Sequence, residues 1–487
     1  MKRLALALLA GLFLLLLIVV LRTLTFSSRQ IAVQPAAQSS LDRAALLQRL
    51  SRAVQFRTVS HQDPRQLPAA EFDRFRAFLA ESFPLVHKHL DRETIGGQSL
   101  LFKWQGRDGA LKPILLMAHM DVVPVDPATE AAWRHPPFSG AIADGYVWGR
   151  GTMDDKGSVL AILEAVEHLL AAGFSPRRTI YLAFGHDEEI GGHDGAAKIA
   201  ERLRARGVEL EFVIDEGMNI FDGVIAGVAA PVALIGIAEK GYLSLRLTVE
   251  TTGGHSSIPP GDSAIALMSR ALQRIDAAPF PSRLDGPTRE MFEFLGPEMA
   301  WSQKLALANL WLFDPLVRKQ LARSPLTNAV IRTTIAPTMF NAGVKENVLP
   351  TTAAAVVNLR LMPGDTIAST TEHVRRAIDD PKIKVEALPT QMEPSAVSDI
   401  AAPSFRLIER TIRETAPQAL VAPALLVAAT DSRHYRGLTK NIFRFLPITL
   451  GPEDTKRYHG NDERISVRDY ERLVRFYARL VQNSDHL

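Results

Sequence analysis

The chain has 487 residues, more than a single hydrophobic core ordinarily contains, so two or more structural units are expected. Apolar residues make up 47% and charged residues 22%, a composition typical of a globular protein. Lys and Arg total 56 against 53 Asp and Glu, and no dense basic run occurs, so we expect no nucleic-acid partner. The absence of cysteine excludes disulfides, thiolate metal sites and cysteine nucleophiles.

The first 40 residues predict a membrane anchor and a linker. Residues 4–21 form an uncharged apolar run with basic residues on both sides. A helix over this run spans roughly 27 Å, close to the hydrocarbon thickness of a bilayer. A cleaved signal peptide usually has a shorter apolar core, of about 7 to 15 residues, followed directly by a small-residue cleavage site. We therefore expect an uncleaved transmembrane anchor over 1–22 and a linker over 23–40.

The charges that flank the apolar run bear on location. Because basic residues lie on both sides, they favour a cytoplasmic N-terminus only weakly. With that orientation the folded part lies outside the cytoplasm, in the periplasm or the extracellular space. Cleavage of the N-terminal segment would instead give a secreted form.

The folded part opens with an amphipathic pattern over 41–54 that predicts a helix. Short apolar runs then alternate with longer helical patterns. The predicted strands and helices are, in chain order, strand 114–118, helix 158–172, strand 179–184, helix 195–206 and strand 212–214. This order is the signature of a parallel sheet with crossover helices.

The pattern changes between residues 239 and 388. Residues 241–250 and 353–361 show the alternation typical of strands. Residues 366–378 show a helical pattern, and residues 285–324 form a long, mostly helical insert. The chain then returns to a helix, a strand and a last helix, over 403–414, 441–446 and 467–481.

We therefore expect an α/β fold in which a catalytic domain is interrupted by a smaller domain. The catalytic domain has two parts, 41–238 and 389–487, with a mostly parallel sheet flanked by helices. The interrupting segment, 239–388, would form an α+β lid or dimerisation domain.

Polar residues follow each predicted strand of the catalytic domain. His119 and Asp121 follow the first strand, Glu188 and Glu189 follow the second, and Asp215 follows the third. Because ligands gather at the carboxyl ends of parallel strands, we expect these side chains to lie together. Imidazole and carboxylate groups are ligands of zinc and similar divalent ions.

Each candidate has a structural alternative. A single histidine is more often hydrogen-bonded than metal-bound, Asp154-Asp155 could cap a helix, and Glu188-Glu189 could lie in a solvated loop. A metal site would resolve the repulsion between the two glutamates, with one as a ligand and the other as a general base on water. With Asp215 and His459, the set of two histidines and at least three carboxylates suits two zinc ions that share a carboxylate.

Several motifs together resemble the zinc peptidase M20 family, which includes aminoacylases, carboxypeptidases and dipeptidases. The motifs are His119-Met-Asp121, Gly149-Arg-Gly-Thr-Met-Asp154-Asp155-Lys-Gly157, Asp187-Glu188-Glu189-Ile-Gly-Gly192, Asp215-Glu216-Gly217, Gly253-Gly-His255-Ser-Ser257 and His459-Gly-Asn-Asp-Glu463. Within the family, the chain resembles the carboxypeptidase S and N-fatty-acyl-amino-acid hydrolase/synthase branch. This closer resemblance depends on Thr430-Asp-Ser-Arg433-His-Tyr435, Phe443-Arg-Phe445 and Pro452-Glu-Asp454.

The resemblance implies roles for the matching residues. The implied metal ligands are His119, Asp154, Glu189, Asp215 and His459. Asp154 would bridge two zinc ions, for which cobalt or manganese could substitute; His119 and Asp215 would complete one ion, Glu189 and His459 the other. Asp121 would orient His119, and Glu188 would be the general base. Family members hold the bond between the two turn aspartates in cis, which we expect at Asp154-Asp155.

The resemblance also implies substrate-binding residues. His255 would stabilise the oxyanion, often from a second subunit, which predicts a possible homodimer through the lid domain; its alternative is a flexible polar turn. Arg433 resembles the family's carboxylate-binding arginine, and Asn347 resembles a polar residue of the lid. The apolar insert 292–321 could line a fatty-acyl pocket or pack the lid, and both alternatives stay open.

These observations predict a membrane-anchored di-zinc amidohydrolase that cleaves an amide bond next to a free carboxylate, with Glu188 as the base. The substrate is a small molecule, with an N-acyl-amino acid favoured over a peptide, so a carboxypeptidase or dipeptidase is the alternative activity. An alternative of another class is a catalytically silent, M20-like binding ectodomain. An aminopeptidase would need a group that binds a free ammonium, and Arg433 argues against it.

Overall fold

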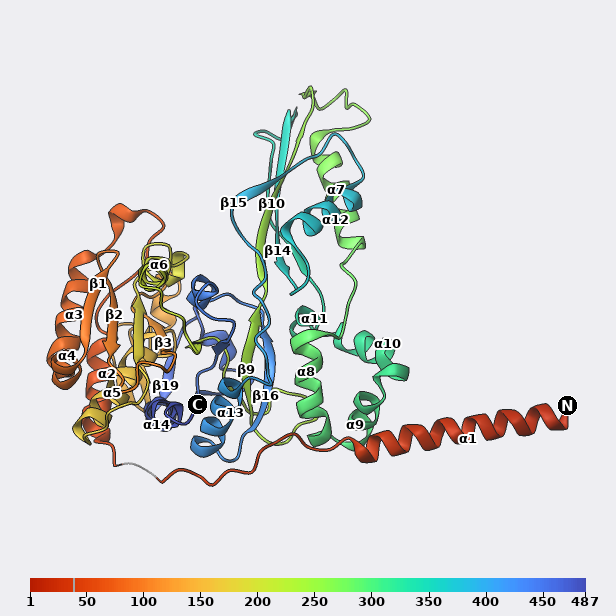
Figure 1. Ribbon diagram of the computed structural model, residues 1–487. Coiled ribbons are helices and arrows are strands. Elements are labelled where there is room, and N and C mark those ends of the chain that lie inside the picture. The colour runs from red at the N-terminus through yellow and green to blue at the C-terminus, as the bar shows by residue number, and fades with distance from the viewer. Residues whose placement is uncertain (38–39) are drawn as a thin grey trace.

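The computed structural model describes residues 1–37 and 40–487. A projecting N-terminal helix, a large α/β unit and a smaller sheet with helices on one side make up the molecule (Figure 1). The α-helices are α1 (Lys2–Thr25), α2 (Arg43–Ala53), α3 (Ala69–Ser82), α4 (Pro84–His89), α5 (Lys156–Ala171), α6 (Ala196–Ala205), α7 (Ala264–Ala277), α8 (Gly286–Leu295), α9 (Trp301–Ala308), α10 (Leu310–Leu321), α11 (Pro325–Ala329), α12 (Ile367–Ile378), α13 (Pro403–Thr415) and α14 (Val467–Ser484).

The strands form one large sheet and three smaller ones. They are β1 (Asp91–Ile95), β2 (Ser99–Trp104), β3 (Ile114–His119), β4 (Ile142–Ala143), β5 (Tyr146–Trp148), β6 (Ile180–Gly185), β7 (Phe212–Asp215), β8 (Ile220–Phe221), β9 (Val232–Glu239), β10 (Gly241–Glu250), β11 (Gly254–His255), β12 (Thr334–Ala342), β13 (Val348–Leu349), β14 (Thr352–Leu361), β15 (Lys384–Met392), β16 (Leu420–Leu426), β17 (Ile442–Arg444), β18 (Thr449–Leu450) and β19 (Arg464–Ser466).

The large sheet has ten strands in the order β1-β2-β6-β3-β7-β17-β9-β8-β18, with β16 also paired to β9. Its centre is parallel, because β3 pairs with both β6 and β7 in the parallel sense. The pairs β1–β2, β2–β6, β8–β9 and β9–β17 are antiparallel. The pairs β7–β17, β8–β18 and β9–β16 are parallel as well, so parallel pairs outnumber antiparallel ones. The expected α/β fold, with a mostly parallel sheet flanked by helices, is confirmed, and the antiparallel pairs make the sheet mixed.

The antiparallel edge arises from a hairpin. β1 and β2 pair from Ile95 opposite Ser99, and Gly96 and Gly97 in the turn between them have φ values of +61° and +89°. Two consecutive left-handed residues are what a tight hairpin turn needs, and glycine adopts them without steric cost. This hairpin adds strands to the sheet without a crossover helix.

The central strands are buried on both faces, which explains their continuous apolar sequences. Every residue of β3, β6 and β7 is buried. Helix α5 packs against β3 and is itself covered by α14 and α2. The sequence predicted these elements correctly because both a doubly covered strand and a helix within the core are apolar almost throughout.

The smaller sheet has the order β12-β14-β10-β15 and stands away from the large one (Figure 1). Alternate residues of β14 are buried, and they pack with side chains of α7 and α12 in a second hydrophobic core. The helical insert of the sequence prediction is present as α8, α9 and α10. Helix α8 packs on β16 of the large sheet, whereas α9 contacts α1.

The segment after α1 runs along the α/β unit. Gln30 pairs with β16 through both ends of its side-chain amide: Nε2 donates to the Val421 carbonyl at 2.8 Å, and Oε1 accepts from the Val421 N–H at 2.7 Å. Further along, the Ala36 N–H donates to the carbonyl of Glu414 at 3.0 Å. This part of the predicted linker is therefore attached to the folded unit at two points.

Candidate metal and catalytic site

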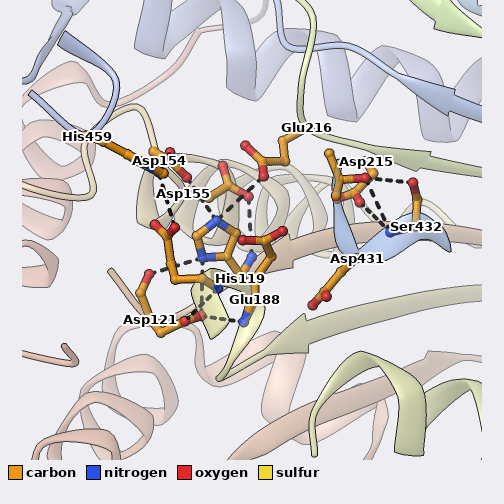
Figure 2. Close-up of polar contacts among 12 residues, drawn as sticks. His119, Asp121, Asp154, Asp155, Glu188, Asp215, Glu216, Asp431, Ser432 and His459 are labelled. Carbon is orange, nitrogen blue, oxygen red and sulfur yellow. Dashed lines mark hydrogen bonds and ion pairs between the residues drawn. The ribbon is translucent and has the colours of Figure 1, made fainter. Parts of the chain in front are cut away.

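The carboxyl ends of β3, β6 and β7 bring together most of the predicted polar residues (Figure 2). His119 ends β3 and is only 2% exposed. Its Nδ1 lies 3.0 Å from the carbonyl oxygen of Asp121 and 3.3 Å from the Asp121 carboxylate. Its Nε2 points the other way, 2.9 Å from Asp154 Oδ1 and 3.6 Å from Glu216 Oε1. Asp121 therefore fixes the ring so that Nε2 faces two carboxylates.

A second group of ligand atoms shares Asp154 with the first. His459 Nε2 lies 3.2 Å from Asp154 Oδ2 and 3.1 Å from Glu189 Oε2. The two oxygens of Asp154 thus face different histidines. The Asp154-Asp155 peptide bond is cis, as expected.

The electrostatics of these groups reflect crowded carboxylates. Burial raises the pKa of Glu216 to about 8, and the negative charge of Asp154 adds to the effect. Hydrogen bonds to Asp154 and Glu189 raise the pKa of His459 to about 10. Burial opposes a positive charge on His119, but hydrogen bonds to three carboxylates outweigh it and raise the pKa of that ring well above its usual value.

The donor set fits divalent cations. In each group, His119-Asp154-Glu216 and Asp154-Glu189-His459, one imidazole and two carboxylates place ligand atoms within 4.8 Å of one another. Oε1 of Glu189 is buried without a hydrogen-bond partner, which is costly for a carboxylate oxygen. Imidazole and carboxylate ligands suit zinc and related ions, so each group is able to hold one.

Asp215 does not lie in either group. Its Oδ2 accepts a hydrogen bond from the Ser432 N–H at 2.9 Å, in the short 3-10 helix Asp431–Tyr435, and the neighbouring Glu216 faces His119 instead. Successive side chains at a strand end point to opposite sides, so only one of the pair can face the metal groups. The sequence prediction named only Asp215 of this motif as a ligand, and the structure places the carboxylate of Glu216, not that of Asp215, beside His119.

The predicted base lies in the turn after β6. The backbone N–H groups of Glu188 and Glu189 donate to the two carboxylate oxygens of Asp121, at 3.2 and 3.1 Å. Asp121 therefore orients His119 and holds the turn that carries both glutamates. Burial raises the pKa of Glu188 well above its usual value, and the nearby Asp431 carboxylate adds to the effect.

Arg433 lies beside the same turn. One terminal nitrogen donates to the carbonyl of Thr430 and the other to the carbonyl of Gly191, each at 2.7 Å. Because Gly191 directly follows the 3-10 helix Glu188–Ile190, this guanidinium is adjacent to the predicted base.

His255 and Asn347 come together elsewhere. They lie beside the pairing of β11 with β13, where the Ser256 N–H donates to the Asn347 carbonyl at 3.2 Å. Both are exposed, and His255 Nδ1 accepts from the N–H of Ser257 at 3.1 Å. In Figure 1 the yellow-green loop after β10 and the blue-green turn between β12 and β14 lie at the far end of the smaller sheet, so one chain in this conformation does not bring these two residues to the metal groups.

Two residues that position the site were not predicted: Arg150 and Glu463, a buried ion pair at 2.7 Å. Glu463 Oε1 also accepts from the N–H groups of Gly151, Met153 and Asp154, at 2.9, 2.9 and 3.2 Å. Arg150 in turn donates to the carbonyl of His459 at 3.2 Å. Glu463 stood within a recognised motif, but only its long-range contacts reveal the role.

The matched family supports a metal-dependent hydrolase. The sequence profile described as peptidase family M20/M25/M40 matches residues 115–483. A probable carboxypeptidase S-like 2 of Dictyostelium discoideum is 43% identical over 96% of this chain and 92% of its own. The N-fatty-acyl-amino acid synthase/hydrolase PM20D1 of Xenopus tropicalis is 42% identical over 98% and 94%, and carboxypeptidase S of Saccharomyces cerevisiae is 31% identical over 91% and 84%.

Solved structures share the fold at low sequence identity. The M20 family metallo-carboxypeptidase Sso-CP2 of Sulfolobus solfataricus superposes with a TM-score of 0.64 at 17% identity, covering 92% of this chain and all of its own. Human carnosine dipeptidase 1 gives 0.63 at 16% identity, covering 91% and 97%. The profile match and the identity to full-length relatives decide the assignment: this chain belongs to peptidase family M20/M25/M40 and is an enzyme of that family.

Proposed function

We propose that the chain is a di-zinc hydrolase that cleaves an amide bond adjacent to a free carboxylate, with N-acyl-amino acids as the favoured substrates. The observation that carries this proposal is the pair of ligand groups that share Asp154, next to the half-buried Glu188. Cobalt or manganese would suit the same ligands. The names of the relatives span both N-acyl-amino-acid and carboxypeptidase activities, so cleavage of a C-terminal peptide bond is the second candidate.

The ligands proposed for the two ions are His119, Asp154 and Glu216 for one, and Asp154, Glu189 and His459 for the other. Glu216 replaces Asp215 in this proposal because its carboxylate, and not that of Asp215, faces His119. When bound, divalent cations in such a site would lower the pKa of water and polarise the amide carbonyl.

The chain's own residues would move the proton. Glu188 is proposed to take a proton from water and to deliver one to the leaving amine. Its position is fixed by Asp121, which accepts from the backbone of the turn. Burial raises the pKa of this carboxyl group, and a raised pKa makes it a stronger proton acceptor than an exposed glutamate.

The free carboxylate of the substrate would pair with Arg433. A guanidinium binds a carboxylate through two parallel hydrogen bonds. The hydrogen bonds of Arg433 to two backbone carbonyls hold its guanidinium beside the turn that carries Glu188. The Arg433 side chain is 19% exposed. A substrate carboxylate would be a stronger partner than a neutral carbonyl because it is charged.

The oxyanion donor is proposed to be His255, with Asn347 as a neighbouring polar contact. Because both lie at the far end of the smaller sheet, we propose that a second copy of the chain supplies them, in a homodimer formed through residues 239–388. The domain limits 41–238, 239–388 and 389–487 belong to the same proposal.

Helix α1 is proposed to anchor the enzyme in a membrane, with the catalytic part outside the cytoplasm. By length and composition α1 is able to cross a bilayer, with a mean hydropathy of 3.3 and 6% of its apolar window buried. A signal sequence has the same properties, so protease-resistant membrane association of the intact chain, with its N-terminus retained, is the measurement that supports an anchor. A processed N-terminus contradicts it.

The purified chain is expected to hydrolyse N-acyl-amino acids and to lose activity with a chelator. The variant Glu188→Gln should lower kcat by about 10²–10⁴-fold, because the amide cannot accept the proton. Metal analysis of the same sample should still find the ions bound. Loss of metal from E188Q would contradict its assignment as the base, and a metal-loaded chain that hydrolyses neither acyl-amino acids nor dipeptides would contradict the proposed function.

Glu216→Gln and Asp215→Asn form a matched pair that tests the ligand assignment. E216Q should lower bound metal from about two ions per chain to about one, because a carboxylate ligand is lost. D215N should keep both ions and instead lower the free energy of unfolding by about 1–3 kcal/mol through its bond to Ser432. Elemental analysis measures the bound metal, and denaturant unfolding measures the stability of each variant. If D215N loses an ion and E216Q keeps both, Asp215 is the ligand.

Arg433→Ala should raise KM for N-acyl-amino acids by about 10–100-fold, the loss of a charge-assisted pair of hydrogen bonds. The same substrates with the carboxylate converted to an amide should show similar KM with both enzymes. Arg436→Ala, which removes an exposed arginine nearby, is the control. If R433A slows acid and amide substrates equally, carboxylate recognition lies elsewhere.

Mixing the inactive variants H255A and E188Q tests whether His255 acts across subunits. A mixed dimer would contain one site with both residues intact, so random exchange should restore about a quarter of wild-type activity. Each variant alone stays inactive. A mixture without activity, with dimer exchange verified by differently tagged chains, would place His255 in its own subunit's site. Activity of H255A alone would place His255 outside the mechanism.

A further inference from the structure

Helix α9 lies against the end of α1, and α10 packs on α9 (Figure 1). Asn309, fully buried between the two helices, donates from Nδ2 to the Val19 carbonyl at 3.1 Å and to Thr23 Oγ1 at 3.2 Å. Arg22 Nε donates to the carbonyl of Ala308 at 3.3 Å. Val19 and Thr23 are the residues of α1 that become buried. The contact is therefore polar, specific and confined to the last two turns of α1.

This contact fixes the depth of α9 and α10 relative to a bilayer. Val19 lies two residues before the end of the apolar run 4–21, a rise of about 3 Å along the helix. Thr23 lies just beyond the run. If α1 spans a membrane, Asn309 and the residues around it lie where the hydrocarbon layer meets the headgroups.

Helix α10 is apolar on two sides. Leu310, Val317 and Leu321 pack inward against Phe292 and Leu307 in a small core. On the outer side, Trp311 is 54%, Leu312 40% and Leu316 62% exposed, and Trp301 on α9 is 52% exposed. An exposed apolar stripe on a helix that has already buried another marks a surface with a partner.

We propose that this outer face of α9 and α10, formed by Trp301, Trp311, Leu312 and Leu316, inserts into the headgroup layer of the membrane as a second contact beside α1. The proposal rests on the proposed membrane anchor. Tryptophan favours this layer because its ring is apolar and its N–H polar. Exposed Lys319 and Arg323, at the end of the same helix, suit anionic headgroups.

The outer face of α9 and α10 is proposed to contact lipid because it lies directly beside α1, the proposed membrane anchor. The stripe begins two residues after Asn309, which is bonded to α1 itself, so the space next to it is the space that surrounds the anchor. The insert 292–321 thereby acquires a role beyond the two sequence-based alternatives, which were to line a fatty-acyl pocket or to pack the lid.

The chain's own tryptophans test the proposal. Of the five, Trp104, Trp133 and Trp148 are at most 7% exposed in the α/β unit. The full chain is reconstituted into vesicles of phosphatidylcholine and phosphatidylglycerol that carry bromine at a shallow acyl position. Bromine should quench part of the fluorescence of the wild type and of Trp133→Phe, and this quenching should be lost in the double variant Trp301→Phe/Trp311→Phe.

Equal quenching of the wild type and the double variant, or none in the wild type, would overturn the proposal. A second pair avoids changing the reporters: Leu312→Ser with Leu316→Ser should weaken the quenching, whereas Val344→Ser, at an exposed apolar residue of the smaller sheet, should not. If alkaline carbonate extracts the chain from the vesicles, α1 is not a membrane anchor, and the proposal that depends on the anchor is wrong as well. Hydrolysis by detergent-solubilised W301F/W311F tests the catalytic proposal separately, because it needs no membrane.

Discussion

The buried ion pair between Arg150 and Glu463 joins the two halves of the site. Glu463 comes more than 300 residues after the turn 151–154 and accepts hydrogen bonds from three N–H groups of that turn. Arg150 donates a hydrogen bond to the carbonyl of His459. Burial raises the pKa of Glu463 to about 7, and the charge of Arg150 counteracts the rise. The pair contacts both the turn that leads to Asp154 and the loop that carries His459, where φ is +57°, so it links the positions of these two residues.

Around this pair, three buried or half-buried carboxylates lie close enough together to repel one another. Asp154, Glu189 and Glu216 converge on a volume that water cannot screen well, and two imidazoles are the nearest compensation. Bound cations would remove the repulsion, and they would do so most effectively at Asp154, whose two oxygens face different histidines. The same burial that makes the carboxylates costly also raises the pKa of Glu188, so ligand binding and base strength share one physical cause.

The sequence predicted the central strands, the helices between them and the polar residues at the strand ends, because burial on both faces leaves a continuous apolar pattern. It named Asp215 as a ligand, whereas Glu216 is the carboxylate that faces His119, and one residue of register decides between the two. The antiparallel edge was missed although Gly96 and Gly97 mark its hairpin. The position of the helical insert depends on tertiary contacts such as Asn309 with Val19, for which local sequence has no signal.

The two attachments of residues 26–37 limit how the α/β unit can move relative to α1. A flexible linker would let the α/β unit rotate freely above a membrane, and the metal groups would sample many heights and orientations. Here Gln30 is paired with Val421 and Ala36 with Glu414, while Asn309 holds the insert to α1. These contacts attach α1 and the α/β unit to each other at several points, so that if α1 spans a membrane, the metal groups are held at a limited range of heights and orientations above the lipid.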